Sequence, residues 1–185
     1  MSKSIIFFIN LIIKINFMKS IIIAVFFLMT PLFGISQNAN ELYIKGVQSF
    51  DQKKFNDALN YLNQAIEKSP DFNEAYLKRG VIFLIFKDFK KAIFDFDKAI
   101  ELGSVNELTF YNRGIAERNI GELNPAIIDF TKAISMNPDF GLAYFNRALT
   151  KLSLDDFTGA CPDLSRAADL GIETATEIYK YNCMK

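Results

Sequence analysis

Small and large side chains recur along this chain with a period of 34 residues. In the clearest copy, residues 110–138, the apolar side chains between Ala126 and Ile134 fall at i, i+1, i+4, i+7 and i+8, which is one stripe on a helix. A short helical hairpin cannot bury both of its faces alone, so it needs copies of itself as neighbours. The period therefore predicts a stack of helix–turn–helix hairpins. The columns of small residues are Gly46, Gly80, Gly114 and Ala148; Ala58, Ala92, Ala126 and Ala160; and Ala65, Ala99, Ala133 and Ala167.

The glycine column predicts close contact between helices. Glycine inside a helix costs about 1 kcal/mol relative to alanine, yet it recurs three times here. A missing side chain lets the partner helix approach, which offsets this cost.

A phosphate-binding loop is excluded, because no cluster of glycines precedes the start of a helix. The large residues that recur with the same period are Phe55, Phe89, Leu123 and Phe157, and Leu62, Phe96, Phe130 and Leu164.

These columns resemble the tetratricopeptide repeat family over roughly residues 40–174. The aromatic column of that family is present as Leu42, Tyr76, Phe110 and Tyr144, and its terminal proline as Pro70 and Pro138. Ser104 and Ile172 replace the proline in the second and fourth repeats, so the turns there depart from the pattern of the family. Pro162, deeper in the last repeat, is expected to delay or bend its helix.

The resemblance implies an all-α fold, a right-handed α-solenoid of four antiparallel helix pairs with a C-terminal capping helix. We expect one domain over residues 37–185, with repeats at 39–72, 73–106, 107–140 and 141–174. The predicted helices are 40–52 and 55–68, 74–86 and 89–101, 107–120 and 123–136, 142–154 and 157–169, and a cap at 173–182.

Residues 1–36 differ from the rest of the chain. Lys19 precedes an apolar run at 21–33, and Gly34 and Ser36 are small residues at −3 and −1 of a cut after Ser36. This arrangement is typical of a secretory signal peptide, with Met18 as the start of translation. We therefore expect an exported protein, periplasmic or secreted, with no stable membrane span after cleavage. An uncleaved anchor over residues 5–33 is the alternative, although it would place lysines inside the span at high cost.

Composition argues against an enzyme. The 185 residues include no histidine, which removes the usual catalytic triads and most transition-metal sites. A catalytic carboxylate pair would not be expected to recur with the structural period. We therefore expect no catalytic residues, no cofactor and no metal. The acidic column is Asp95, Asp129 and Asp163, and the basic column is Lys45, Arg79, Arg113 and Arg147; both are expected to form salt bridges between stacked helices.

Net charge argues against a nucleic-acid partner. Three of the 21 basic residues and none of the 21 acidic residues precede residue 37, which leaves 18 basic residues in the predicted mature chain and a net charge of −3. Nothing in this balance favours binding to a polyanion.

The two cysteines, Cys161 and Cys183, are expected to form a disulfide. In an exported protein, a pair with no cysteine left over favours a bond. Closing a loop of this length would stabilise the end of the array by about 3 kcal/mol. The alternative is that Cys161 is simply a small core residue. A redox-active pair is disfavoured, because the spacing is unlike C-x-x-C.

The resemblance also implies a concave groove lined by the first helix of each repeat. Tyr43 and Val47 stand where relatives that clamp the acidic tails of heat-shock chaperones need Lys and Asn, so that clamp is absent. The remaining side chains suit a peptide with apolar anchors. The groove positions are Tyr43, Leu77, Tyr111 and Phe145; Val47, Val81, Ile115 and Leu149; Phe50, Leu84, Arg118 and Leu152; and the polar Lys78, Asn112 and Asn146.

The function expected from this groove is a non-enzymatic protein–protein interaction module that binds an unknown peptide or protein. Two alternatives stay open. Val47, Val81 and Ile115 would contribute only core if they pack between neighbouring first helices. The protein would instead be a structural or assembly component if another copy fills the concave face in a homo-oligomer.

Overall fold

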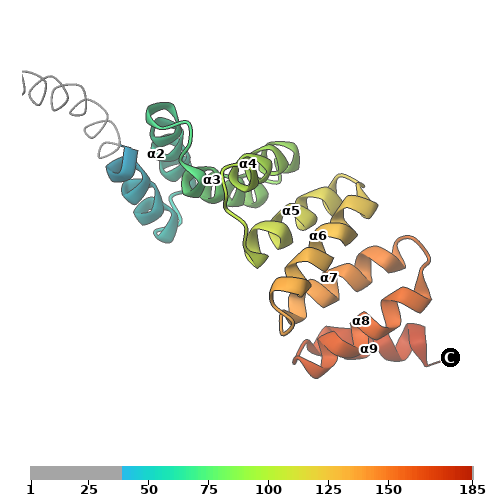
Figure 1. Ribbon diagram of the computed structural model, residues 1–185. Helices are drawn as coiled ribbons and strands as arrows, with labels where there is room; N and C mark the ends of the chain where they lie inside the picture. Colours follow the sequence, from blue (N-terminus) through green and yellow to red (C-terminus); the bar gives the residue numbers. More distant parts are fainter. Residues whose placement is uncertain (1–38, 185) are drawn as a thin grey trace, which may run out of the picture.

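The computed structural model describes residues 39–184, and helices are the only regular elements in this part of the chain (Figure 1). The predicted signal peptide, the candidate start Met18 and the cut after Ser36 lie outside the described residues. Residues 39–51 are helical and form the first hairpin with α2 (Phe55–Lys68). The later helices are α3 (Asn73–Ile85) and α4 (Phe89–Glu101), α5 (Glu107–Asn119) and α6 (Leu123–Met136), α7 (Gly141–Leu152) and α8 (Phe157–Asp169), and α9 (Glu173–Cys183).

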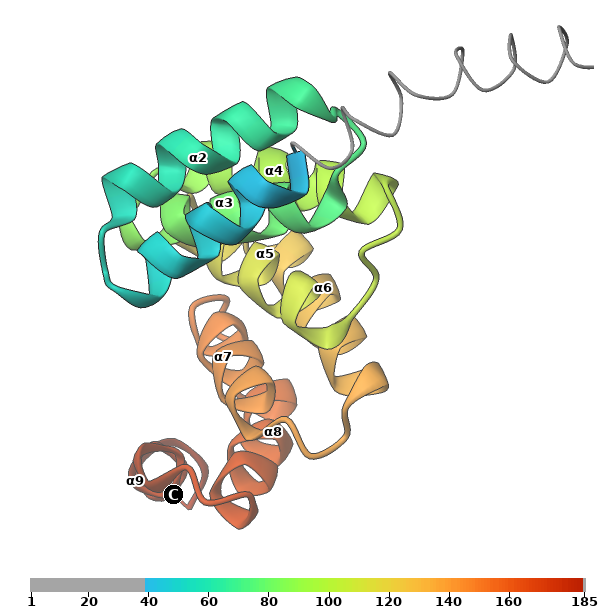
Figure 2. The same cartoon turned by 90° about the vertical axis from the view of Figure 1, so that its left-hand side faces the viewer.

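Each helix from α2 to α9 contacts the next one along the chain. In addition, α3 contacts α5 and α5 contacts α7, so the first helices of successive repeats lie side by side. Figure 2 shows the hairpins following one another from residue 39 to the C-terminus. The predicted all-α solenoid is therefore confirmed. We call the surface formed by residues 39–51, α3, α5 and α7 the first-helix face.

Close packing explains the glycine column. A Cβ atom on Gly80 would lie 2.8 Å from Cε1 of Phe96, and one on Gly114 would lie 2.9 Å from Cε1 of Phe130. Both phenylalanines are fully buried. The fourth repeat has Ala148 in this column, and there the large partner is Leu164 rather than phenylalanine. In the second and third repeats the glycine thus faces an aromatic ring, as the predicted close approach requires, whereas Gly46 of the first repeat faces Leu62.

An arginine ladder joins the hairpins. In each of the last three repeats, an arginine of the first helix donates two hydrogen bonds to an aspartate on the second helix of the same repeat, at 2.5–2.8 Å. Its third contact, from Nη1, reaches the second helix of the preceding repeat at 2.6–2.9 Å. The predicted salt bridges are therefore confirmed for these three repeats. The ladder consists of Arg79 with Asp95 and Asn63, Arg113 with Asp129 and Asp97, and Arg147 with Asp163 and Thr131.

The two turns that lack proline end their helices with glycine. Gly103 and Gly171 have φ angles of +95° and +87°, which a glycine adopts without steric cost. The next residues close the helix ends, because Ser104 N–H donates to the carbonyl of Ala99 and Ile172 N–H donates to that of Ala167. This is the Schellman pattern, so glycine ends these two helices without the family's proline.

Pro162 does not delay its helix, so that part of the expectation was wrong. Helix α8 begins at Phe157, which is one period after the start of α6 at Leu123. Asp156 caps this start, because its side chain accepts a hydrogen bond of 2.9 Å from the N–H of Gly159. Proline thus stands at the sixth helical position without shifting the start of the helix, although it has no N–H to donate to the carbonyl of Thr158.

A disulfide connects the last two helices. Cys161 on α8 is bonded to Cys183 on α9, with their Cα atoms 5.8 Å apart. Helix α9 packs on the cluster around Ala160 and Leu164 through Ala175, so it covers the open end of the stack. A terminal repeat needs such a cover, because it has no further neighbour.

Reduction of this disulfide should lower the free energy of unfolding by about 3 kcal/mol. The bond joins residues 22 positions apart, and without it the unfolded chain gains conformational entropy. Denaturant titration with and without reductant measures the change. A Cys161→Ala/Cys183→Ala variant serves as control, since reductant should not affect its stability. Intact mass of the protein from an oxidising compartment gives the thiol count, and two free thiols would contradict the bond.

Candidate peptide-binding groove

The predicted groove residues all lie on the first-helix face, and each of them is half-buried. None is fully buried and none is fully exposed. They therefore combine core packing with accessible surface. Leu77, Val81 and Leu84, for example, pack against the buried cluster that contains Phe96. Val81 thus contributes to the core, as the alternative interpretation of the groove residues expected, but it also keeps some accessible surface.

Two tyrosines of the groove are held by phenylalanines from the turns between repeats. The rings of Tyr43 and Phe72 are 4.9 Å apart at 46°, and those of Tyr111 and Phe140 are 4.7 Å apart at the same angle. These pairs lie exactly two periods apart in sequence. Phe72 and Phe140 are the residues just before α3 and α7. The sequence reasoning missed them, although each comes directly after a Pro–Asp pair.

A side-chain hydrogen bond links the third and fourth repeats at the level of Tyr111. The side-chain amide of Asn146 donates to the hydroxyl of Tyr111 at 3.1 Å, and also to the carbonyl of Leu142 at 2.9 Å. Burial raises the pKa of Tyr111, and this outweighs the opposing effects of Arg118 and of Asn146. The tyrosine hydroxyl is therefore neutral and fixed in place, on a ring that is still partly accessible.

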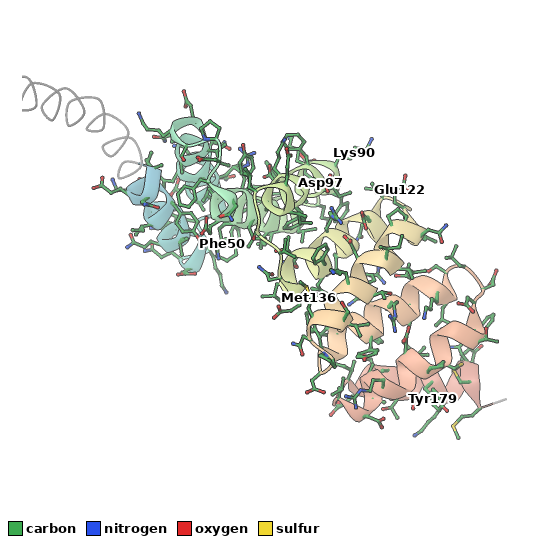
Figure 3. The ribbon with its side chains drawn as sticks, viewed as in Figure 1. Phe50, Lys90, Asp97, Glu122, Met136 and Tyr179 are labelled. Carbon is green, nitrogen blue, oxygen red and sulfur yellow. A yellow bond between two sulfur atoms is a disulfide. The ribbon has the colours of Figure 1, made fainter. Side chains whose placement is uncertain are left out.

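Two cations of the groove lack a carboxylate partner within the described residues. The Nζ atom of Lys78 lies 4.9 Å from the centroid of the Phe50 ring, a cation–π contact between the first and second repeats. Phe50 is labelled in Figure 3. Arg118 is close enough to Tyr111 to affect its ionisation. The ladder arginines, by contrast, all pair with aspartates, so Lys78 and Arg118 remain available to an incoming acidic group.

Exposed aliphatic residues complete this surface, and the sequence reasoning missed them. They lie three or four residues along the helix from a predicted groove position, which places them on the same helix face. Ile44 occupies the column that otherwise holds Lys78, Asn112 and Asn146. An aliphatic residue in a polar column is the signal that could have revealed it. The four residues are Ile44, Ile85, Leu108 and Leu142, between 44 % and 53 % exposed.

Other kinds of site find little support between residues 39 and 184. No group of three or more Cys, Asp or Glu side chains in this range is arranged to hold a metal ion. Every helix in the same range is too short or too polar to cross a bilayer.

Comparison with known protein families identifies the repeat. Two models, both described as tetratricopeptide repeat, match residues 49–107 and residues 109–140. A curated relative, the DnaJ protein P58IPK homolog of Arabidopsis thaliana, is 44 % identical over 55 residues. That match covers 30 % of this chain and only 11 % of the relative.

Solved structures share the fold. A crystal structure of MamA superposes with a TM-score of 0.75 at 20 % identity, and the match covers 79 % of this chain and 81 % of MamA. The first tetratricopeptide domain of Spaghetti (RPAP3), bound to the HSP90 peptide SRMEEVD, superposes with a TM-score of 0.62 at 22 % identity. That match covers 65 % of this chain and 95 % of the domain.

Proposed function

Because the chain belongs to the tetratricopeptide repeat family, we propose that it is a non-enzymatic interaction module whose first-helix face binds an apolar segment of a partner protein. The observation that carries the proposal is the set of exposed aliphatic residues on this face, one on each of the four first helices. The same face carries half-buried aromatic rings, and those of Tyr43 and Tyr111 are packed against Phe72 and Phe140. Apolar anchors of a partner peptide would cover such residues and remove them from water.

The positive side chains on this face favour a partner segment that contains an acidic residue. Lys78 and Arg118 have no carboxylate partner within the described residues, so an acidic side chain in the bound segment would pair with one of them. The solved relative that carries an acidic HSP90 peptide offers an analogy for this part of the proposal. The groove of this chain has Tyr43 and Val47 at two positions of the chaperone clamp, so we propose a different, more apolar ligand.

We propose further that the protein acts outside the cytoplasm, in the periplasm or as a secreted protein. The signal-like pattern of residues 1–36 and the Cys161–Cys183 bond both support this location. Sequencing the N-terminus of the mature protein tests it. A first residue at or near Gln37 is the expected result.

Site-specific photo-cross-linking tests the binding face. A photoreactive amino acid at position 142 of the first-helix face should capture a partner in intact cells. The matched control is position 128, because Ile128 on α6 is an exposed aliphatic residue of a second helix, 68 % exposed. A product of twice the mass of this chain would instead mean self-association through the groove, the structural or assembly alternative. Capture from position 128 but not from position 142 would contradict the groove.

The captured partner then allows an affinity measurement. Leu108→Ser/Leu142→Ser should weaken binding at least tenfold, since each exposed leucine that a partner buries contributes on the order of 1 to 2 kcal/mol. The control variant Phe94→Ser/Ile128→Ser removes two exposed apolar residues from second helices and should leave the Kd within about twofold. Equal affinities for the two variants would contradict the proposal. Circular dichroism checks that both variants fold.

A further inference from the structure

Glu117 on α5 is a carboxylate without a hydrogen-bond partner. Its side chain is only 12 % exposed, and its Oε2 atom is buried with no partner within the described residues. Its Oε1 atom lies 4.0 Å from Nε of Arg113, too far for a hydrogen bond. Arg113 already donates to Asp129 and to Asp97, at 2.6–2.8 Å. The guanidinium of this ladder position is therefore occupied by two other carboxylates.

The equivalent positions in the other repeats carry no such charge. They are Ser49, Phe83 and Lys151. Lys151 donates to Oδ2 of Asp163 at 2.8 Å and to the carbonyl of Gly159 at 3.0 Å, so the fourth repeat adds a cation where the third adds an anion. Only the third repeat thus places an extra carboxylate against its own ladder.

The charged groups around Glu117 come from each element packed against it. Asp97 belongs to α4, Arg113 to α5, Asp129 to α6 and Glu122 to the turn before α6. Three other carboxylates thus act on Glu117, and Arg113 donates to two of them, Asp97 and Asp129. Because Arg113 bonds to both α4 and α6, this cluster lies at the contact between the second and third repeats.

We propose that Glu117 is a proton-controlled switch at the junction between the second and third repeats. With a proton, the side chain adds no charge to the cluster, and Arg113 keeps its bonds to Asp97 and Asp129. Without the proton, a further anion is confined among carboxylates in a poorly hydrated site, and the junction loosens. The switch goes beyond the proposed binding function and does not depend on it, although the groove spans the same junction.

The direction of the effect follows from linkage. Burial, with a smaller contribution from Asp129, raises the pKa of Glu117 to about 7, although Arg113 opposes the shift. In the unfolded chain the pKa is near the ordinary value of 4.5. Between these values the folded protein binds more protons than the unfolded one, so stability falls as the pH rises. Across pH 6 to 8, Glu117 alone should raise the unfolding equilibrium constant about tenfold.

Denaturant titrations of the full chain at pH 6 and pH 8 test this inference. Glu117→Gln, a neutral variant of the same shape, should lose the tenfold change and be the more stable protein at pH 8. The control Glu67→Gln removes an exposed carboxylate of α2 and should keep the wild-type pH dependence. If Glu117→Gln and the wild type respond equally to pH, the inference is wrong.

A second measurement uses the unaltered protein and therefore does not depend on how the variant folds. NMR titration of the Glu117 carboxyl carbon should give a midpoint near 7. A midpoint near 4.5 would overturn the inference. Neither experiment needs a bound partner, so the failure of the switch and the failure of the proposed groove can be told apart.

Discussion

Replacing Arg79 by methionine is expected to lower the free energy of unfolding by about 3 to 5 kcal/mol. Arg79 makes two hydrogen bonds of 2.7 Å to Asp95, whose side chain is only 1 % exposed. Methionine keeps much of the apolar stem of the arginine but leaves the aspartate buried without its partner. Urea titration at neutral pH measures the loss.

The matched control is Lys78→Met, the adjacent residue on the same helix. Lys78 has no carboxylate partner within the described residues, so its loss should cost less than about 1 kcal/mol. Equal losses for the two variants would contradict the role assigned to the ladder. The double variant Arg79→Met/Asp95→Leu should recover much of the stability, because it removes the buried charge together with its partner.

The pH dependence of Arg79→Met provides an independent check. Burial already raises the pKa of Asp95, even with Arg79 beside it. Removing Arg79 raises that pKa further, so the variant should be closer to the wild type in stability at pH 5 than at pH 8. A loss that does not change with pH would mean that the packing of the arginine stem, and not its charge, stabilises the hairpin.

Gly114→Ala is expected to destabilise the protein by about 1 to 2 kcal/mol, although alanine is the better helix former by about 1 kcal/mol. The added Cβ atom would lie 2.9 Å from Cε1 and 3.1 Å from Cδ1 of the buried Phe130 ring. A planar ring in a close-packed core cannot move aside without disturbing its other neighbours. Thermal or denaturant unfolding measures the change.

A double-mutant cycle isolates this contact. Gly114→Ala/Phe130→Leu recreates the pair that the fourth repeat already uses, Ala148 with Leu164. The two changes together should therefore cost about 1 to 2 kcal/mol less than the sum of the single changes. Additive losses would mean that the glycine is there for another reason.

Gly46→Ala supplies the control from the same column. There the added Cβ atom would meet the Leu62 side chain at 3.0 Å rather than an aromatic ring. Because Leu164 accommodates an alanine in the fourth repeat, Gly46→Ala should be neutral or slightly stabilising. A loss as large as that of Gly114→Ala would contradict the link between glycine and the facing phenylalanine.

Much of the fold could be predicted because the same pattern of small, large and turn residues occurs in four successive repeats. Each hairpin has its own stripe of apolar residues, its own turn and its own small residues. The helix boundaries predicted for one repeat can therefore be compared with those predicted for the other three. This redundancy gave helix boundaries within two residues of those in the described part of the chain. The ladder could be predicted for the same reason, since an arginine column and an aspartate column share one period.

The candidate site was less accessible to the same reasoning. The groove positions could be placed on the first helices, but their exposure depends on how far the facing side chains reach. The turn residues Phe72 and Phe140 hold two of the tyrosines, and they lie 29 residues away from them in sequence. Ile44 stands in the polar groove column of Lys78, Asn112 and Asn146, and Leu142 stands outside the groove columns. Neither was predicted to be an exposed apolar residue of this face.

For this protein, the sequence by itself determined the repeat unit, the order of its helices and the reason for its glycines, because these depend on neighbours a few residues away or exactly one period away. Only the tertiary structure decided which charges are satisfied. Arg113 and Lys151 belong to the same periodic framework as their neighbours, but the unpaired carboxylate of Glu117 becomes evident only when α4, α5 and α6 are packed together. Burial and hydrogen bonding depend on distances between helices, and those distances cannot be derived from the identity of any single residue.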